Sequence, residues 1–303
     1  NDDECLEKIR SIIGKFGHTP KAGFERVEPE PPKFSPSEIY GVIPGEHTKP
    51  FDMYQVLARV VDRSEIDEYK AGYGKTVITA YANIDGWAVG VVAHQRSVVR
   101  TRQGEMQVGG VIYSDSADKA TRFIMNCNQK RIPLVFFQDV TGFMVGKRAE
   151  QGGIIKDGAK MVNAVANSVV PKFTFIVGNS FGAGNYAMCG KAYDPRLIFA
   201  WPTARIAVMG GEQSSNTLLS IKLQSGEAGQ KGKQQVSKEE QEALLNEIRS
   251  RYEREMDPLY CAARLWVDGI IDPLDTREVI SLGIAMANHN PNIPVFNPGV
   301  LQV

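Results

Sequence analysis

Short apolar runs alternate with longer amphipathic segments along the chain from Phe51 onward. An uninterrupted apolar run predicts a strand covered on both faces, because a strand with one solvent face would alternate polar and apolar residues. These runs are TVITAY (76–81), WAVGVVA (87–93), PLVFFQ (133–138), KFTFIV (172–177), RLIFAW (196–201) and RIAVMG (205–210). The spacing predicts helices over 116–128, 150–167, 239–256 and 275–289, with another after 182. The order predicts an α/β fold built from repeated β-β-α units.

The first 50 residues have another pattern. Residues 4–16 (ECLEKIRSIIGKF) place aliphatic side chains at helical spacing and predict a short amphipathic helix. Seven prolines follow between Gly17 and Pro50, which is typical of an extended linker. Asp52 is expected to cap the next helix, MYQVLARVV. We therefore expect a helix and linker over 1–50 and a folded domain over 51–303.

The composition argues against several classes of protein. Lys and Arg total 35, as do Asp and Glu, and a net charge of zero argues against a broad nucleic-acid or membrane surface. No apolar run approaches the ~20 residues of a membrane-spanning helix. Scattered cysteines without a C-x-x-C pair predict reduced thiols in an intracellular protein, and widely separated histidines predict no metal site. They are Cys5, Cys127, Cys189 and Cys261, and His18, His47, His94 and His289.

Residues 173–190, FTFIVGNSFGAGNYAMCG, fit three patterns at once. In the first, Ser180 lies in G-x-S-x-G between a strand and a helix, as a serine-hydrolase nucleophile would. Asp272 or Asp275 and then His289 follow in the order of a triad. However, an H-G-G-G oxyanion loop is missing, and so short a pattern often arises by chance. We favour the ordinary interpretation, in which Ser180 bonds a nearby backbone group and His289 is exposed at a helix end.

The other two patterns involve the residues after Ser180. Gly182, Ala183, Gly184 and Ala187 spell G-x-G-x-x-A, but they lie in mid-chain without the acidic residue expected ~20 positions later, so a dinucleotide site is set aside. A helix beginning near Gly182 would also leave its first N–H groups free to hold an oxyanion beside small residues. Alternatively, the small residues only allow a tight turn, and the sequence leaves both interpretations open.

A second loop has a similar character. QDVTGFMVG (138–146) also lies between an apolar strand and a helix, and Thr141 and Gly142 can turn the chain. Phe143 is expected either as an apolar wall of a site or in the core. Loops at the same end of neighbouring strands in such sheets often share a site, so we expect this loop to lie near residues 182–184.

Three longer stretches resemble a known family. PLVFFQDVTGFMVG, KDGAKMVNAVANSVVPKFTFIVGNSFGAGNYAMCGKAYDPR and WPTARIAVMGGEQ resemble the carboxyltransferase component of biotin-dependent acyl-CoA carboxylases, over a span from about Ile43 to Asn288. More narrowly, GNSFGAGNYAMCGKAY and ARLWVDGIIDPLDTR resemble the 3-methylcrotonyl-CoA carboxylase β-subunit type. The resemblance implies a crotonase-like (ClpP/crotonase) β-β-α superhelix and a C-terminal domain whose N-terminal partner domain is absent from this chain. The chain also opens on Asn1 without an initiator Met, so we expect a processed chain or a piece of a longer one.

The family also implies roles for individual residues. Two consecutive backbone N–H groups stabilise negative charge on the biotin oxygen, and they match the catalytic pair Ala183 and Gly184. Beside this pair we assign Gly182 and, from the neighbouring loop, Thr141, Gly142 and Phe143 to biotin binding, and Asn185, Tyr186 and Ala187 to substrate binding. Propionyl-type relatives carry an acidic residue where this chain has Tyr186, which implies a branched or unsaturated acyl group here. The methylcrotonyl type usually has Gly where this chain has Ala187, a departure that bears on acyl chain length.

Cofactors and partners follow from the same resemblance. It implies carboxybiotin on a carrier domain and an acyl-CoA substrate, with no metal in this domain. It also implies contact with a carboxyltransferase N domain and a biotin carboxylase or biotin carrier subunit, in a homo-trimer or hexamer without nucleic acid or membrane. The implied location is cytoplasmic, or the mitochondrial matrix in a eukaryote. Two alternatives stay open: a binding and assembly module without turnover, and a hydratase or thioesterase that would use Glu212.

Overall fold

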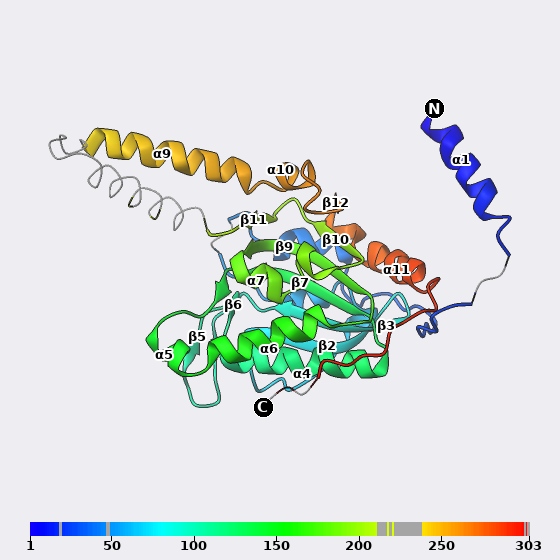
Figure 1. Ribbon diagram of the computed structural model, residues 1–303, viewed down its shortest axis with the longest axis horizontal. Coiled ribbons are helices and arrows are strands. Elements are labelled where there is room, and N and C mark those ends of the chain that lie inside the picture. The colour runs from blue at the N-terminus through cyan, green and yellow to red at the C-terminus, as the bar shows by residue number, and fades with distance from the viewer. Residues whose placement is uncertain are drawn as a thin grey trace.

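The computed structural model describes residues 1–17, 20–46, 49–210, 217, 220, 238–299 and 301, and Figure 1 shows their arrangement. Among these residues, a mixed sheet of eight strands forms the centre. Its strands are, in spatial order, β1 (Asp67–Glu68), β2 (Val77–Ile84), β3 (Trp87–His94), β7 (Leu134–Val140), β9 (Lys172–Phe181), β10 (Leu197–Ala200) and β12 (Gly269–Ile270), and β11 (Arg205–Ala207) pairs with the end of β9. The pairs β1–β2 and β2–β3 are antiparallel, and the pairs from β3 to β12 are parallel. Two small ladders join β4 (Val99–Arg100) to β5 (Met106–Gln107) and β6 (Val111–Ile112) to β8 (Gly142–Phe143).

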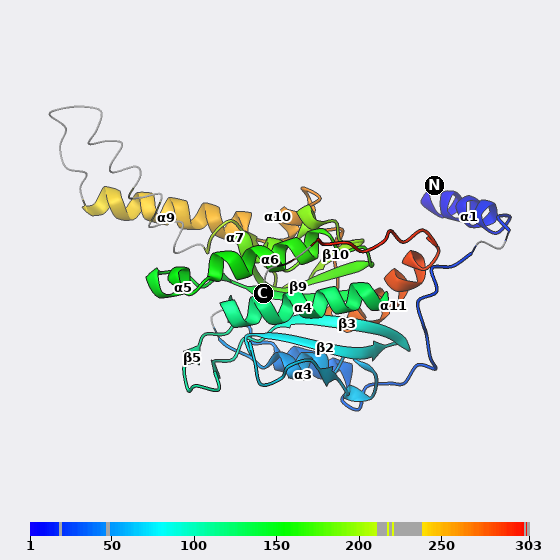
Figure 2. The ribbon, with the colours of Figure 1, turned by 60° about the horizontal axis from the view of Figure 1, so that its bottom comes forward.

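Helices cover both faces of the sheet. On one face, α4 (Ser114–Lys130) and α6 (Ile154–Ala166) lie side by side, and on the other lie α3 (Met53–Leu57) and α11 (Thr276–Ala287) (Figure 2). The other described helices are α1 (Asp2–Ile13), α2 (Ile39–Val42), α5 (Lys147–Gln151), α7 (Gly182–Ala187), α9 (Lys238–Glu255) and α10 (Pro258–Ala262). Short 3₁₀ turns occupy Pro36–Glu38, Asp62–Ser64, Lys191–Tyr193 and Pro273–Asp275.

The two covered faces explain why the strands are apolar throughout. Every residue of β7 is buried. Because successive side chains of a strand point to opposite faces, Val135 and Phe137 pack in the core that includes α3 and α11. Leu134 and Phe136 pack in the core that includes α4 and α6. The structure therefore confirms the predicted α/β class and the doubly covered sheet.

Several boundaries differ from the prediction, and three of the differences have a clear physical cause. β2 runs to Ile84, which pairs with Trp87, so the hairpin turns on Asp85–Gly86 alone, both at positive φ. β9 continues to Phe181, beyond its apolar run, because its last residues pair with β11. The single helix predicted over 150–167 is two helices, since the chain breaks before α6 at Gly153, whose φ is +99°.

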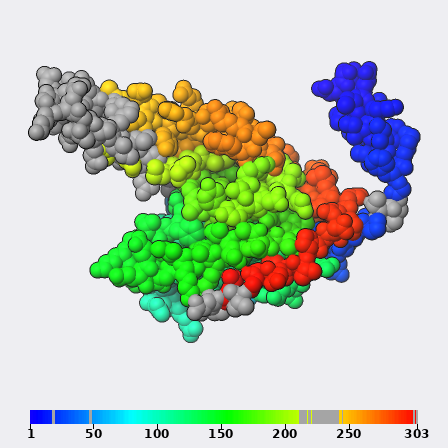
Figure 3. Space-filling view, in the orientation of Figure 1, coloured from blue at the N-terminus to red at the C-terminus, as the bar shows by residue number. Residues whose placement is uncertain are grey.

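The first 50 residues are partly packed against the body. Phe24 and Ile39 are buried in the core that includes α3 and α11. The backbone N–H of Phe24 donates to Asn288 Oδ1 (3.2 Å), which ties this segment to the end of α11. In contrast, α1 ends at Ile13, has no buried residue and stands apart from the body (Figures 1 and 3). The predicted capping role of Asp52 is confirmed, because its carboxylate accepts from the N–H of Tyr54 (3.1 Å).

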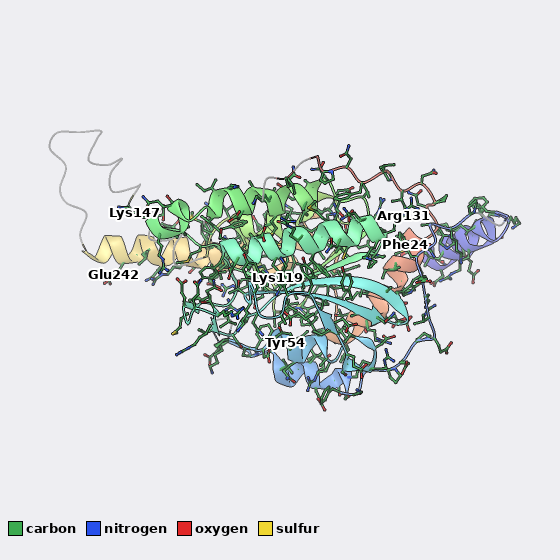
Figure 4. All side chains as sticks on the ribbon, turned by 90° about the horizontal axis from the view of Figure 1, so that it is seen from below. Phe24, Tyr54, Lys119, Arg131, Lys147 and Glu242 are labelled. Atoms are coloured by element: carbon green, nitrogen blue, oxygen red, sulfur yellow. The ribbon has the colours of Figure 1, made fainter. Side chains whose placement is uncertain are left out.

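A cluster of three polar side chains, Glu68, Lys119 and Tyr54, links the helices on the two faces of the sheet at one edge. Lys119 on α4 and Tyr54 on α3 are labelled in Figure 4. The Lys119 Nζ donates to Glu68 Oε1 (3.2 Å), and the Tyr54 hydroxyl donates to Glu68 Oε2 (2.7 Å). Burial lowers the pKa of Lys119, and Glu68 opposes that shift. Edge strand β1, which carries Glu68, is thereby held to both helices.

Candidate functional site

The two loops singled out in the sequence lie together at the carboxyl ends of β7 and β9. Gly184 packs directly on the other loop: a Cβ at this position would overlap Val140 Cγ2 and lie 3.3 Å from Gly142 Cα. Parallel neighbouring strands end at the same edge of a sheet, and β7 pairs with β9 along most of its length. The expectation that the two loops are neighbours is therefore confirmed.

A sharp turn presents the first N–H groups of α7. Gly182 has a φ of +51°, a conformation that favours glycine, and a Cβ there would lie 2.9 Å from the Val208 carbonyl oxygen. The first N–H groups of an α-helix have no acceptor within the helix. No side chain caps α7, and in the described part of the chain no carbonyl outside the helix accepts from Ala183 or Gly184. Ala183 is exposed, whereas Gly184 is buried against the other loop, so this end of α7 reaches the surface at Ala183.

Ser180 lies beneath this turn and is not placed as a nucleophile. It belongs to β9 and is fully buried. Its hydroxyl donates to Gln138 Oε1 (2.6 Å) and accepts from Asn185 Nδ2 (2.7 Å). The hydroxyl is therefore engaged by side-chain amides both as a donor and as an acceptor. Asp272, the first candidate acid, instead accepts from the Tyr40 hydroxyl (2.5 Å). The serine-hydrolase interpretation is therefore not favoured.

The residues of the 141–143 loop have separate roles. The Thr141 N–H and hydroxyl both donate to the Gly110 carbonyl oxygen (2.8 and 3.1 Å), which fixes the start of the loop. Phe143 is half-buried, and its ring lies so close to Gly158 of α6 that a Cβ there would be 2.8 Å from Phe143 Cε1. Its ring also lines an apolar groove of about 720 Å³ that runs along α6 to Tyr193. Phe143 thus serves both as a wall of this groove and as part of the packing.

The residues expected on the substrate side do not all face outward. Tyr186 is 48% exposed, and its ring contacts Tyr193 at 5.7 Å between centroids. Ala187 is fully buried in the core that includes α4 and α6, so its methyl group does not reach the surface. The Asn185 amide is turned inward to Ser180. Only Tyr186 of the three presents its side chain at the surface.

A larger cavity, of about 1200 Å³, adjoins the other side of the 141–146 segment. Met144, Val145 and Gly146 form one wall, and residues 101–107 form part of another. Its lining includes five cationic side chains, Lys70, Lys75, Arg102, Lys147 and Arg148, against the carboxylates of Glu105 and Asp115. Met144 and Val145 line both the cavity and the groove, so the two hollows adjoin at the segment that follows Gly142.

A buried ion pair near these loops is not apparent from the sequence pattern. The Arg96 Nε lies 3.1 Å from Asp139 Oδ2, and Asp139 Oδ1 accepts from the N–H of Asn179 (2.9 Å). Burial raises the pKa of Asp139 to about 6, although Arg96 opposes the shift. A Cβ on Gly110 would lie 2.6 Å from Arg96 Nη1, so the pair also restricts the loop that receives Thr141. The only sequence signal was the polar pair Gln138–Asp139 at the end of an apolar strand.

The remaining candidate features are metal-binding groups, membrane-spanning helices, cysteine thiols and Glu212. Within the described ranges, no group of three His, Cys, Asp or Glu residues is arranged to hold a metal ion, and no helix is long and apolar enough to cross a membrane. The cysteines are free; Cys5 is exposed, and burial raises the pKa of Cys127 to about 12. Glu212, considered above as a carboxylate for hydratase chemistry, and the histidines His18 and His47 lie outside the described residues.

Known proteins match the chain over nearly its whole length. A model of the carboxyl transferase domain matches residues 1–298. The chain is 44% identical over 291 residues to the biotin-dependent 3-methylcrotonyl-coenzyme A carboxylase beta1 subunit of Mycobacterium tuberculosis, which covers 96% of this chain and 52% of that protein. It is 44% identical over 288 residues to the mitochondrial methylcrotonoyl-CoA carboxylase beta chain of Arabidopsis thaliana, with 94% and 46% covered. The chain thus spans about half the length of these curated relatives.

Solved structures share the fold. The beta subunit of P. aeruginosa geranyl-CoA carboxylase matches with a TM-score of 0.78 at 34% identity, covering 100% of this chain and 54% of that one. Transcarboxylase 12S matches with a TM-score of 0.76 at 33% identity, covering 93% and 50%. Sequence and structure therefore agree with the resemblance seen in the motifs. The chain belongs to the carboxyl transferase domain family.

Proposed function

We propose that this chain forms the biotin-side half of a carboxyltransferase, which moves the carboxyl group of carboxybiotin to an acyl-CoA. The observation that carries the proposal is the start of α7, which no described side chain caps: Ala183 is exposed there, and Gly184 behind it packs on Gly142. Membership of the carboxyl transferase domain family supports it. Relatives over the same span are named as biotin-dependent 3-methylcrotonyl-CoA and methylcrotonoyl-CoA carboxylases.

The start of α7 fits a flat anionic group. Ala183 is exposed and small, and Gly184, which is buried behind it, has no side chain. When bound, carboxybiotin would supply the carboxyl group; its ureido nitrogen would take the proton that the acyl-CoA loses, and its ureido oxygen would carry negative charge after the carboxyl group departs. The N–H groups of Ala183 and Gly184 would donate to that oxygen, and the positive end of α7 would add to the effect. Because the turn at Gly182 fixes these donors beforehand, little reorganisation is needed during the reaction.

The neighbouring residues shape the biotin side. Gly182 and Gly142 let the backbone approach the ligand without side chains, and Thr141 holds its loop by its two bonds to Gly110. Phe143 supplies an apolar surface between the groove and the packed side of α6. We assign these four positions to biotin binding, with the chain contributing shape and hydrogen bonds rather than an acid or a base.

Tyr186 is the residue that we assign to substrate choice. It is exposed beside Tyr193, at the end of the apolar groove, whereas Asn185 and Ala187 act from behind it through packing. An uncharged aromatic ring suits a branched or unsaturated acyl group of the 3-methylcrotonyl type. Carboxylation of a panel of acyl-CoA thioesters by the complete holoenzyme tests this assignment. Preference for propionyl-CoA, or equal rates across the panel, would contradict the role of Tyr186, and no carboxylation of any thioester would contradict the proposed function.

The wider assembly is part of the proposal. We assign residues 51–303 to a C-terminal carboxyltransferase domain of crotonase-like β-β-α type, preceded by an inter-domain helix and linker over residues 1–50. Its partners are a carboxyltransferase N domain and a biotin carboxylase or biotin carrier subunit, within a homo-trimer or hexamer. The solved transcarboxylase 12S is a hexamer assembly, which supports this arrangement. We assign the protein to the cytoplasm, or to the mitochondrial matrix in a eukaryote. The Arabidopsis thaliana and Dictyostelium discoideum relatives are named as mitochondrial, which supports a mitochondrial location in a eukaryote.

A further inference from the structure

Beneath the start of α7, three polar side chains form a continuous hydrogen-bonded chain within an otherwise apolar layer. We infer that Gln138, Ser180 and Asn185 are positioning residues, which hold the N–H groups of Ala183 and Gly184 in place for catalysis. This inference rests on the proposed function. It also gives Asn185 a role different from the substrate contact expected from the sequence.

The hydrogen bonds run from the sheet into the helix and back. Asn185 Nδ2 donates to Ser180 Oγ (2.7 Å), and Ser180 Oγ donates to Gln138 Oε1 (2.6 Å). Gln138 Nε2 then donates to the Met188 carbonyl oxygen (2.7 Å) just beyond the end of α7, and it also approaches the Asn185 carbonyl oxygen (3.5 Å). Gln138 and Ser180 are fully buried, so the bond between them and the bond from Gln138 to Met188 are shielded from water. The chain thus holds α7 at its middle and at its carboxyl end.

α7 needs such support because it is short. It has six residues, and isolated helices shorter than ~12–15 residues are marginal in water. Its position is therefore set by contacts with the sheet rather than by helix propensity. Gly184 supplies one such contact, by packing on Val140 and Gly142, and the chain of polar bonds supplies a directional one. Donors must be placed to a fraction of an ångström to act on a developing charge, so small displacements of α7 matter.

Gly190 closes the other side of the Asn185 amide. A Cβ on Gly190 would lie 2.5 Å from Asn185 Cγ, so no side chain fits there unless Asn185 moves. The Gly190 N–H also donates to the Asn185 carbonyl oxygen (2.8 Å). Its φ of −66° is one that any residue adopts, so a Gly190→Ala substitution displaces the Asn185 amide without straining its own backbone.

The experiment compares Ser180→Ala and Gly190→Ala with the wild type, in the complete holoenzyme. The matched control is Thr121→Val, which removes a hydroxyl that donates to the Ala117 carbonyl oxygen (2.7 Å), equally buried but in α4. Two kinds of measurement are made: steady-state kinetics, which give kcat and KM for the acyl-CoA, and hydrogen–deuterium exchange over residues 181–189. We expect both test variants to lower kcat by about tenfold to a hundredfold, with KM little changed, and to speed exchange over 181–189 alone. The control should change neither quantity.

A second variant covers the case in which Ser180→Ala fails to fold. Gln138→Met combined with Ser180→Ala removes both partners of the 2.6 Å bond, so that Gln138 Oε1 is not left buried without a donor, although the Met188 carbonyl oxygen and Asn185 Nδ2 lose their partners. The double variant should unfold below the wild-type temperature, remain folded at the assay temperature and still show the loss in kcat. Wild-type kcat and wild-type exchange in the Ser180→Ala and Gly190→Ala variants would overturn the inference. If Ser180→Ala and Gly190→Ala behave as the wild type but Ala183→Pro abolishes transfer in the same assay, only the positioning role fails. A fully active Ala183→Pro variant would instead overturn the proposed function.

Discussion

The Ala183→Pro substitution isolates one of the two proposed donors. Proline has no N–H, and the Ala183 N–H lies in the first turn of α7, where no helical carbonyl accepts it. Proline is tolerated in the first turn of a helix, and the exposed position leaves room for its ring. We therefore expect the free energy of unfolding to change by about 1 kcal/mol or less, which is small beside the catalytic effect. This distinguishes the site from Gly184, where any added side chain would collide with Val140.

The expected loss follows from the role of a preorganised donor. Removing one such donor costs about 3–4 kcal/mol in the transition state, or about a hundredfold to a thousandfold in kcat. The assay is transfer from carboxybiotin to the acyl-CoA by the complete holoenzyme, with the thermal unfolding temperature measured in parallel. Ala183→Ser is the matched control, since it changes the side chain and keeps the N–H. A folded Ala183→Pro enzyme with wild-type kcat would refute the argument that this amide carries the chemistry.

Three further predictions concern stability. Gly184→Ala should destabilise the fold by about 1–3 kcal/mol in urea unfolding, because the added methyl overpacks the contact between the two loops, and an unchanged midpoint would contradict that packing. Burial lowers the pKa of His94 to about 3 from 6.5, because the folded state favours the neutral ring. The contribution of His94 to the free energy of unfolding is therefore fully present above pH 6.5, and it falls on acidification by up to about 1.4 kcal/mol per pH unit. His94→Leu should remove that slope in urea unfolding at a series of pH values, and a slope equal to that of the wild type would contradict the assignment. Asp139→Asn should lower the free energy of unfolding by about 3–5 kcal/mol, because the buried Arg96 loses its carboxylate partner. Glu65→Gln, which breaks the exposed pair with Lys33, should leave the urea midpoint nearly unchanged. Equal midpoints for the two variants would contradict this difference.

The sequence predicts the sheet well because burial on both faces leaves a strong local signal. Every residue of β7 is buried, and its apolar run has no other simple explanation. The end of β9 is different, because Gly178 to Ser180 has the composition of a turn. Pairing with β11, which is distant in the sequence, keeps these residues in the strand. Local composition could not reveal that pairing.

The site could be predicted only in part. Small residues after two neighbouring strands indicate close loops, and the structure places Gly184 against Gly142. The role of Ser180 depends on two amides that lie 42 residues before it and five residues after it, and no local pattern joins them. The buried Asp139–Arg96 pair is equally remote in sequence. Such networks form only when the tertiary fold brings polar residues together.

The most direct test of the central claim is a crystal structure of the assembled holoenzyme with biotin bound. The proposal predicts that the ureido oxygen lies about 2.7–3.1 Å from the backbone nitrogens of Ala183 and Gly184, beside Gly142. A biotin whose ureido oxygen is held elsewhere, with these two nitrogens facing away from it, would contradict the account.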